Sequence, residues 1–344
     1  MLFRLIPFVF ACVAVLATIA PPGHAQPQTL NIYSYRTPQL LQPLLDAYSD
    51  ETGVEFQVLH APKGLAQRLQ AEGALSPADL ILTVDIARLS EVADLNLLAP
   101  TTSPTLTANV PSHLRAKDNT WYALSTRARV VITSPDRVPA NAITRMEDLA
   151  LPKWRGKICT RIGSHVYNRA LLASLVAHLG EAEAQRWAAG LVANMARKPQ
   201  GNDRAQARAI YAGACDIALI NTYYYGLMQF NQAETDQQDW AKAVRLNFLN
   251  QAPGDRGQHI NISGAGIVKT SRNQAEAKKF LEWLTEPKAQ RLYASINFEY
   301  PVNPRVAIDD RVSAWGGFRA DDLPIEDIAK HSPTAQRIID RTGW

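Results

Sequence analysis

The sequence lacks the features that mark membrane-spanning and nucleic-acid-binding proteins. After residue 25, no segment approaches the run of about eighteen apolar residues that a membrane-spanning helix needs. The net charge is only +4, and it falls to +3 without Arg4, since 35 basic residues then face 32 acidic ones. The basic side chains are also scattered among acidic ones, so the composition argues against a nucleic-acid partner.

Motifs of common enzyme classes are absent as well. The chain contains no G-x-S-x-G elbow, no H-E-x-x-H pair and no G-x-x-x-x-G-K phosphate loop. Two carboxylate pairs, Asp309-Asp310 and Asp321-Asp322, lie in polar stretches that are typical of solvated loops. We therefore expect that the protein is not an enzyme.

Cysteine is scarce, with three residues in the whole chain. Cys12 lies in an N-terminal apolar run, which leaves Cys159 and Cys215, both near the starts of expected strands. An even pair in an oxidising compartment favours a disulfide, and two buried free thiols are the alternative. The pair lacks the C-x-x-C spacing of a zinc site.

The N-terminus has the pattern of a secretory signal peptide. Arg4 precedes an apolar run, Leu5–Ala20, and small residues precede an expected cleavage after Ala25. We therefore expect residues 1–25 to be removed, and the mature protein to be exported to the periplasm.

The order of strand and helix patterns predicts an α/β fold. The 319 residues that follow the signal peptide (344 minus 25) exceed what one core usually holds, which favours two domains. Strand patterns at Leu30–Ser34, Val54–Leu59 and Leu80–Val84 alternate with helical patterns, as in a parallel sheet. Two further extended runs, Arg127–Thr133 and His259–Val268, are interpreted as crossings between two lobes. Such an architecture is a hinged clamp that binds its ligand in a cleft.

The crossings also predict lobe boundaries. We expect a first lobe at 26–126 plus about 262–300, and a second lobe at about 134–255 plus 301–344. The crossing strands themselves are expected at about 127–133 and 256–262.

A run of three tyrosines is the clearest functional signal. The stretch Asn221-Thr222-Tyr223-Tyr224-Tyr225-Gly226 follows a buried strand, Ile217–Ile220, and ligands bind at such strand ends in open α/β sheets. Neighbouring phenols converge only where the backbone leaves strand geometry, as it does on entering a helix or turn. A phenol normally ionises near pH ~10, but a hard trivalent cation lowers that pKa. Paired phenolates therefore indicate ferric iron, with aromatic packing as the alternative.

Six segments together carry a resemblance to a known family. They are Ile32-Tyr33-Ser34-Tyr35-Arg36, the run from Ser76 to Asp85, Thr126-Arg127-Ala128-Arg129-Val130, Gly163-Ser164-His165-Val166-Tyr167-Asn168, Gly201-Asn202-Asp203-Arg204-Ala205-Gln206, and Asn221-Thr222-Tyr223-Tyr224. The chain resembles the periplasmic ferric-iron-binding proteins, the transferrin-like substrate-binding components of bacterial iron ABC transporters. The resemblance covers essentially the whole mature chain. It implies a two-lobed type II periplasmic binding protein with a hinge between two α/β domains.

The resemblance also implies a set of iron ligands. Tyr223 and Tyr224 match the paired ligands of the family and Tyr167 matches a third, although the residues alone leave Tyr224-Tyr225 open as the pair. Many members add a His after the first strand or a Glu after the third. Here those positions read Arg36-Thr37-Pro38 and Val84. The site therefore resembles the branch that uses three tyrosines and an exogenous anion.

The expected anion is carbonate or bicarbonate, which can fill the open positions on Fe3+. Arg36 and Arg127 are expected to bind it, because a guanidinium presents two parallel donors to a planar oxyanion. Thr37 and Asp85 are weaker candidates for hydrogen bonds around the ligands, since both residue types usually cap helices. Arg129 is a weaker candidate for the anion than Arg36 and Arg127, and His165 is not expected to take part.

The sequence thus predicts a monomeric binding protein that captures ferric iron and passes it to an inner-membrane ABC permease with its ATPase. The main alternative is a small organic solute in the same cleft, on which the tyrosines would stack. Two others are a sensory partner of a membrane receptor, and an iron-assisted oxidase, which an all-phenolate site disfavours.

Overall fold

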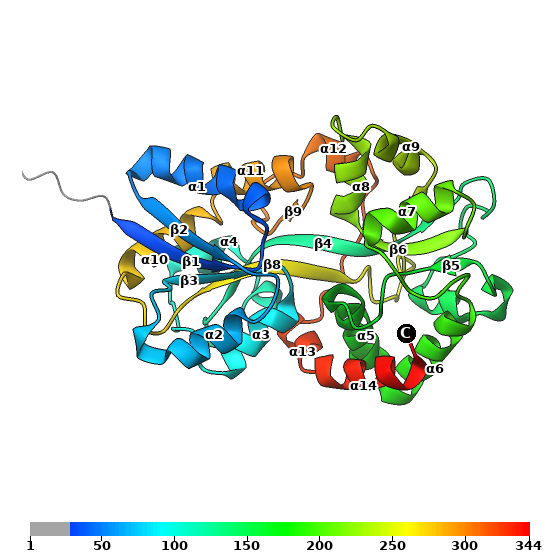
Figure 1. The fold of residues 1–344 in the computed structure, drawn as a ribbon, viewed down its shortest axis with the longest axis horizontal. Coiled ribbons are helices and arrows are strands. Elements are labelled where there is room, and N and C mark those ends of the chain that lie inside the picture. Colours follow the sequence, from blue (N-terminus) through cyan, green and yellow to red (C-terminus); the bar gives the residue numbers. More distant parts are fainter. Residues whose placement is uncertain (1–27) are drawn as a thin grey trace, which may run out of the picture.

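The structure is a computed structural model that describes residues 28–344. It has two lobes side by side, each built of strands covered by helices, and one long strand runs through both (Figure 1). The expected signal peptide at 1–25 lies outside the described residues. Within residues 28–344, no helix combines the length and the apolar character that crossing a membrane requires.

Nine strands of the described chain form one connected sheet. Their bounds are β1 (Thr29–Ser34), β2 (Glu55–His60), β3 (Leu80–Thr83), β4 (Tyr122–Thr133), β5 (Ile158–Cys159), β6 (Ile217–Asn221), β7 (Arg245–Asn247), β8 (Ile260–Ile267) and β9 (Tyr300–Pro301). The order is β2-β1-β3-β8-β4-β6-β5, and β7 and β9 also pair with β4. β1 is parallel to both β2 and β3, which confirms the predicted parallel α/β arrangement.

The helices gather into two groups, one around each end of the sheet (Figure 1). The first group is α1 (Pro38–Thr52), α2 (Leu65–Glu72), α3 (Ile86–Asp94), α4 (Pro104–Asn109), α10 (Gln274–Trp283) and α11 (Pro287–Asn297). The second is α5 (Val166–Leu179), α6 (Glu181–Ala193), α7 (Asp203–Tyr211), α8 (Thr222–Gln229), α9 (Asp236–Lys242) and α14 (Ser332–Thr342), while α12 (Asp310–Ser313) and α13 (Ile325–Ala329) precede α14. Short 3-10 turns lie at Gly73–Leu75, Ser112–Leu114, Met146–Ala150 and Pro152–Trp154.

Strand β4 joins the two lobes. Up to Ala128 it pairs antiparallel with β8, and from Arg129 onwards it pairs antiparallel with β6. The change of partner falls inside the crossing expected at 127–133, and β4 extends further towards the N-terminus than that prediction. The lobe boundaries themselves stay a prediction. All side chains of β4 are buried, including those at the change of partner.

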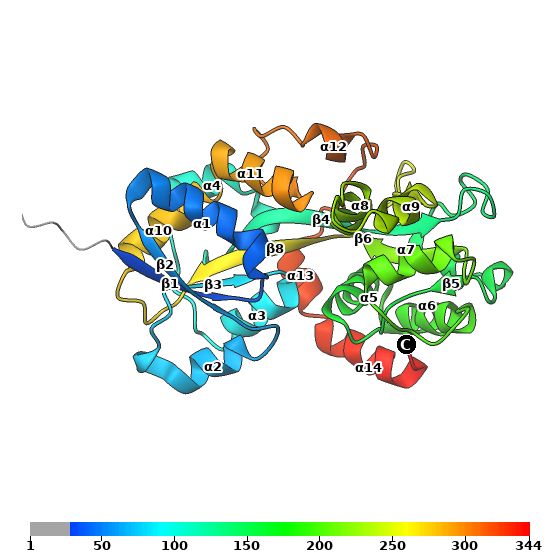
Figure 2. The same ribbon diagram turned by 45° about the horizontal axis from the view of Figure 1, so that its top comes forward.

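Helix α1 has clear start and stop signals, and its N-terminal end lies near the cleft-lining residue Thr37. The helix begins at Pro38, whose missing N–H costs nothing in a first turn, and it ends at Gly53 in the left-handed conformation, with φ of 73°. Leu41, Leu45 and Tyr48 face the core at helical spacing. The residues just before the helix therefore lie at its N-terminal end, where they face the second lobe (Figure 2).

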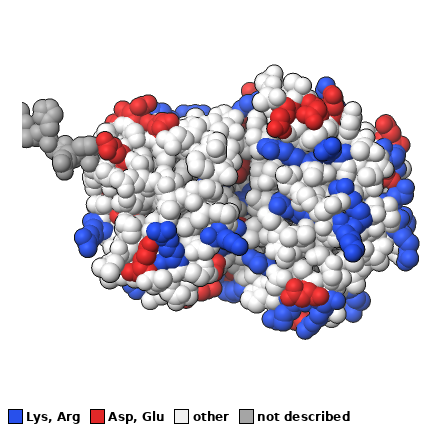
Figure 3. Space-filling view, viewed as in Figure 1, with Lys and Arg blue, Asp and Glu red and all other residues white. Residues whose placement is uncertain are grey.

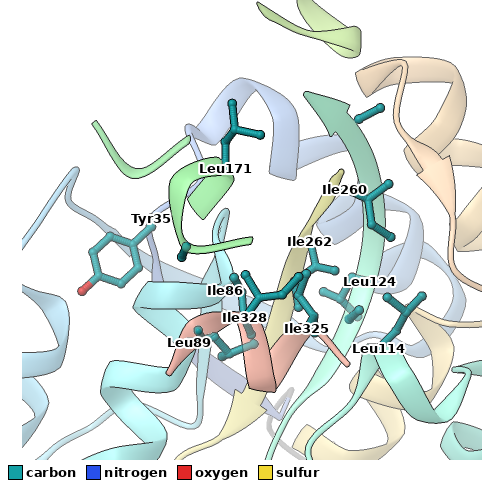
Figure 4. Close-up of a cluster of buried hydrophobic side chains, with 14 of the residues drawn as sticks. Tyr35, Ile86, Leu89, Leu114, Leu124, Leu171, Ile260, Ile262, Ile325 and Ile328 are labelled. Atoms are coloured by element: carbon teal, nitrogen blue, oxygen red, sulfur yellow. The ribbon is translucent and has the colours of Figure 1, made fainter. Parts of the chain in front are cut away.

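A buried apolar cluster connects the lobes. Ile325 and Ile328 of α13 lie close to Ile86 and Leu89 of α3 (Figure 4). Helix α13 also contacts α5, and α14 packs on α5 and α6. The C-terminal part of the chain is thus packed against both groups of helices.

Candidate functional site

A cleft of about 380 Å³ lies between the lobes. It is lined by Tyr35, Arg36, Thr37, Gln39, Leu40, Val84, Arg127, Tyr167, Arg204, Tyr223, Tyr224, Leu227 and Glu299. Three tyrosines and two arginines that the sequence indicated thus face one cavity. In the view of Figure 3, Lys and Arg side chains are more frequent on the right-hand lobe than on the left-hand one.

The paired tyrosines lie where a strand becomes a helix. Strand β6 ends at Asn221, and α8 begins at Thr222, so Tyr223 and Tyr224 belong to the first turn of α8. Their ring centroids are 4.3 Å apart, and both rings line the cleft. Tyr225 instead packs edge-on against Trp315, at 5.5 Å, outside the cleft lining. The helical turn therefore presents Tyr223 and Tyr224, rather than Tyr224 and Tyr225, to the cavity.

Tyr167 reaches the same place from α5. It stands in the first turn of that helix, and its backbone N–H is 3.3 Å from Nδ1 of His165, the N-cap residue. The Tyr167 hydroxyl is 2.9 Å from the Tyr223 hydroxyl. Two elements that are distant in the sequence thus bring their phenol oxygens into hydrogen-bonding contact.

The protein by itself does not ionise the paired phenols Tyr223 and Tyr224. Burial raises the pKa of Tyr223 well above its usual value, and the neighbouring phenols Tyr167 and Tyr224 raise it further. Burial also raises the pKa of Tyr224, with Tyr167 again adding to the shift. At neutral pH Tyr223 and Tyr224 therefore keep their protons until a strong positive charge enters the cleft, as a hard trivalent cation would.

Arg36 is buried at the wall of the cleft and is already paired. Its Nη2 is 3.0 Å from each carboxylate oxygen of Glu299, and it also donates to the hydroxyl of Ser263. Arg36 and Glu299 are each 3% exposed, so their ion pair is buried. Burial alone would lower the pKa of Arg36, but Glu299 raises it above its usual value, and the guanidinium stays charged.

Arg127 lies on β4, next to the point where the lobes meet. Its Nη1 is 3.2 Å from the Ser263 hydroxyl, and Nη2 donates to the backbone carbonyl of Val84. Its Nε atom is buried without a hydrogen-bond partner in the described part of the chain. Because Arg127 lines the cleft, it has donor capacity left for a ligand there.

Of the two weaker candidates, Thr37 lines the cleft and Asp85 does not. Thr37 is the N-cap residue of α1 and lines the cleft, but its side chain makes no capping hydrogen bond. Asp85 caps α3 by accepting from the N–H of Ala87 at 2.8 Å, and it also accepts from Asn261 at 2.7 Å. It does not line the cleft. His165 is outside the lining too, and burial, followed by the charge of Arg161, lowers its pKa to about 3.

Arg129 is hydrogen-bonded to residues of the protein beside the tyrosines. It donates to Asp203 at 2.7 Å and to Asn221 at 3.0 Å, and its guanidinium is 5.8 Å from the centre of the Tyr167 ring. It is outside the cleft lining. The hydrogen bond to Asn221 holds the N-cap residue of the tyrosine helix α8.

Two charged residues of the cleft were missed by the sequence reasoning. Arg204 is the second residue of α7, and its guanidinium lies 5.7 Å from the centre of the Tyr224 ring. Its segment, Gly201-Asn202-Asp203-Arg204-Ala205-Gln206, was part of the family resemblance, so this signal was available. Glu299 carried no local signal, since it follows the end of α11 at Asn297 and meets Arg36 only through the fold.

The two remaining cysteines form a disulfide in the structure. Cys159, in β5, is bonded to Cys215, two residues before β6, and their Cα atoms are 5.9 Å apart. β5 and β6 are neighbouring parallel strands, with Ile158 paired to Ile217. The bond therefore joins the edge strand to the strand that leads into the tyrosine helix.

Known proteins are similar to this chain over most of its length. Residues 76–320 match the family described as "Bacterial extracellular solute-binding protein". "Iron uptake protein A2" of Synechocystis sp. is 41% identical over 330 residues, which cover 96% of this chain and 94% of that protein. "Major ferric iron-binding protein" of Neisseria meningitidis is 32% identical over 342 residues, with 97% and 98% covered.

Solved structures give the same result for the fold. Ferric iron-binding protein A of Mannheimia haemolytica, in an open conformation, has a TM-score of 0.85 and 42% identity, covering 92% of this chain and 98% of that one. A Trichodesmium protein (IdiA, FutA), in complex with iron and citrate, has a TM-score of 0.87 and 39% identity, covering 92% and 99%. These matches confirm the two-lobed binding-protein fold and the resemblance to ferric-iron-binding proteins. The chain belongs to the bacterial extracellular solute-binding protein family.

Proposed function

We propose that this protein is a periplasmic solute-binding protein that captures ferric iron between its lobes and delivers it to an inner-membrane ABC permease with its ATPase. The phenolates of Tyr167, Tyr223 and Tyr224 would bind the metal. Relatives named as iron uptake and ferric iron-binding proteins, which align with nearly the whole chain, support the iron and the transport role. A role in binding rather than catalysis agrees with the same names.

The observation that carries the proposal is the convergence of three phenols in one cleft. Tyr167 and Tyr223 have their hydroxyl oxygens 2.9 Å apart, and the Tyr224 ring is the immediate neighbour of the Tyr223 ring. Ferric iron prefers hard oxygen donors, and three phenolates balance its charge of 3+. An organic solute would not need three phenol side chains to line one cleft.

The anion follows from the charges around the tyrosines. A neutral centre of iron and three phenolates can bind a further anion only where cationic side chains offset the added negative charge. Arg36 and Arg127 line the cleft and would bind carbonate or bicarbonate there, with Thr37 beside them. Closure of the lobes would then bury the metal and slow its release.

The test is the visible absorption of the purified mature protein during titration with ferric iron in bicarbonate buffer. Phenolate-to-iron charge transfer gives a broad visible band, and we expect Tyr224→Phe to abolish it or shift it strongly. The matched control is Tyr225→Phe, because Tyr225 is the next residue of the same helix but packs on Trp315 outside the cleft.

We expect the control variant to keep the band of the parent protein. If the parent protein shows no band at any iron concentration, the iron proposal is wrong. In that case the tyrosines pack or stack, and the organic solute becomes the better hypothesis. An equal loss in both variants would contradict the assignment of Tyr224 as a ligand.

A further inference from the structure

Glu299 is the one carboxylate among the residues that line the cleft within the described chain. Three cationic side chains, Arg36, Arg127 and Arg204, line it as well. With the charges of iron and three phenolates cancelling, an incoming anion would face three positive side chains and one negative one. Glu299 therefore lowers the net positive charge of the lining from three to two.

The contacts of Glu299 hold one nitrogen of the Arg36 guanidinium, Nη2. Both carboxylate oxygens are 3.0 Å from Nη2, and that same nitrogen also contacts Ser263. The remaining donors of Arg36, on Nη1 and Nε, make no hydrogen bond to any other described residue, while Arg36 lines the cleft. Glu299 thus occupies one nitrogen of the guanidinium, Nη2, and leaves the donors on Nη1 and Nε free.

The carboxylate itself cannot move easily. The hydroxyl of Ser125 donates to its Oε2, and Ser263 lies 3.4 Å from the same atom. The next residue, Tyr300, belongs to β9 and pairs with Thr126 of β4. The side chain is held by strands β4 and β8, and its backbone is fixed by β9.

The residue before Glu299 connects it to the tyrosine helix. Phe298 has a φ of 54°, in the left-handed region that side chains other than Gly rarely adopt. Its ring packs where a Cβ atom on Gly226 of α8 would lie, 2.5 Å from Phe298 Cγ. Backbone strain of this kind persists only where the surrounding structure holds it, and it is common at ligand sites. One short segment thus contacts both the anion side and the tyrosine side of the cleft.

We propose that Glu299 is a positioning and specificity-determining residue, which orients Arg36 towards the cleft and selects a small anion of low charge over a polyanion. The proposal deepens the proposed function and rests on it for the role of the anion. The negative charge of Glu299 lies close to the bound anion, and its repulsion grows with each further negative charge that the anion carries. Carbonate or bicarbonate is favoured by this arrangement, and citrate is disfavoured.

Two substitutions distinguish the effect of the charge of Glu299 from the effect of its side-chain length. Glu299→Gln keeps an acceptor for Arg36 and removes the negative charge. Glu299→Asp keeps the charge but is one methylene too short to hold Arg36. The matched control is Glu147→Gln, since Glu147 also accepts from an arginine, Arg256, at 2.6 Å, but lies outside the cleft lining.

The measurement is the affinity for bicarbonate and for citrate, taken as the anion dependence of the visible band in the iron-loaded protein. Isothermal titration of the iron-free protein with the same two anions gives an independent value. We expect Glu299→Gln to raise the citrate-to-bicarbonate affinity ratio by roughly tenfold. In Glu299→Asp we expect weaker binding of both anions with the ratio nearly unchanged. A residue with only a structural role would not change the ratio.

The two proposals fail in different ways. If the unsubstituted protein shows no visible band with either anion, the proposed iron function fails, and titration of the iron-free protein still decides the role of Glu299. If Glu299→Gln and Glu147→Gln give the same ratio as the unsubstituted protein, the inference about Glu299 is wrong. The same holds if Glu299→Gln favours bicarbonate more strongly. If Glu299→Gln does not fold, an unchanged affinity for both anions in Glu299→Asp also overturns it.

Discussion

Asp203 is a fully buried carboxylate with three charged or polar donors around it. Arg129 donates to Oδ2 at 2.7 Å, Arg161 donates to Oδ1 at 3.0 Å, and the backbone N–H of Asn221 donates at 2.8 Å. Burial alone would raise the pKa of Asp203, but Arg129 and Arg161 hold it below its usual value. Both arginines also lie within 6 Å of the centre of the Tyr167 ring, at 5.8 and 5.3 Å. Asp203 therefore fixes the charged groups behind the tyrosines.

We predict that Asp203→Asn destabilises the protein by about 3 kcal/mol, because it leaves the buried guanidinium of Arg129 and the partly buried one of Arg161 without their counter-charge. The measurement is urea unfolding at pH 7. The matched control is Asp239→Asn, since Asp239 forms an exposed pair with Lys242 and contributes little.

The pH dependence gives a second readout of the same change. A lowered native pKa stabilises the fold at pH values above the usual pKa of aspartate, near ~3.9, and this contribution is lost as the pH falls through the native value. The difference between Asp203→Asn and the unsubstituted protein should therefore be constant from about pH 5 to 8. A difference that already disappears at pH 6 would contradict the assignment to the Asp203 charge.

At the residue scale, the sequence indicated the candidates that carry their own local signal. The tyrosine pair follows a strand pattern, and Arg36 and Arg127 belong to recognisable segments. Glu299 could not be found in this way, because its role depends on a contact with Arg36, which lies 263 positions earlier in the chain. No local pattern encodes such a distant pair.

Helix α8 is the element that converts a tyrosine run into a site. If the chain had continued as a strand, Tyr223 and Tyr224 would have pointed to opposite faces. Since α8 begins at Thr222, both rings reach one cavity, as expected for a backbone that enters a helix. Gly226 permits close packing of this helix on Phe298.

We predict that Gly226→Ala displaces α8 and damages the site. The added Cβ would lie 2.5 Å from Phe298 Cγ, so the helix or the ring must move. Overpacking of this kind costs about 1–3 kcal/mol of unfolding free energy. The ferric charge-transfer band should also weaken or shift, because both tyrosines move with the helix.

Gly317→Ala is the control for this prediction, because a Cβ there meets no atom within 4 Å. The two variants are compared by urea unfolding and by iron titration. Equal spectra and equal stabilities of Gly226→Ala and Gly317→Ala would show that α8 is not held by Phe298.

Among the elements, those with clear start and stop signals were predicted well. Helix α1, Pro38–Thr52, is an example, because proline and glycine mark its two ends. Helix α7 was not predicted, although it carries Asp203 and Arg204. Its polar residues give a low average hydrophobicity, and its buried Asp203 and Gln206 do not look like core residues in a sequence.

At the scale of the whole molecule, the lobes are joined by more than the crossing strands. Helix α13 follows the second lobe in the chain and contacts both α3 and α5. Its Ile325 and Ile328 are 1% and 2% exposed and belong to the cluster in Figure 4. This apolar contact links helices from both lobes.

We predict that Ile328→Ala lowers the unfolding free energy by about 2–5 kcal/mol, the usual cost of a cavity at a buried isoleucine. The measurement is urea unfolding followed by tryptophan fluorescence. Ile308→Ala is the control, because Ile308 is 43% exposed and should change little. If both variants lose the same small amount of stability, α13 is not a structural link between the lobes.

The sequence by itself determined the α/β class, the parallel start of the sheet and the residues with chemistry in their side chains. Those properties depend on residue type and on local periodicity, and both can be read from neighbouring residues in the sequence. Only the tertiary structure decided which tyrosines meet, which arginines are already paired, and that Glu299 lies beside Arg36 in the cleft. These contacts join residues that are far apart in the chain, and they exist only once the sheet and both lobes have packed.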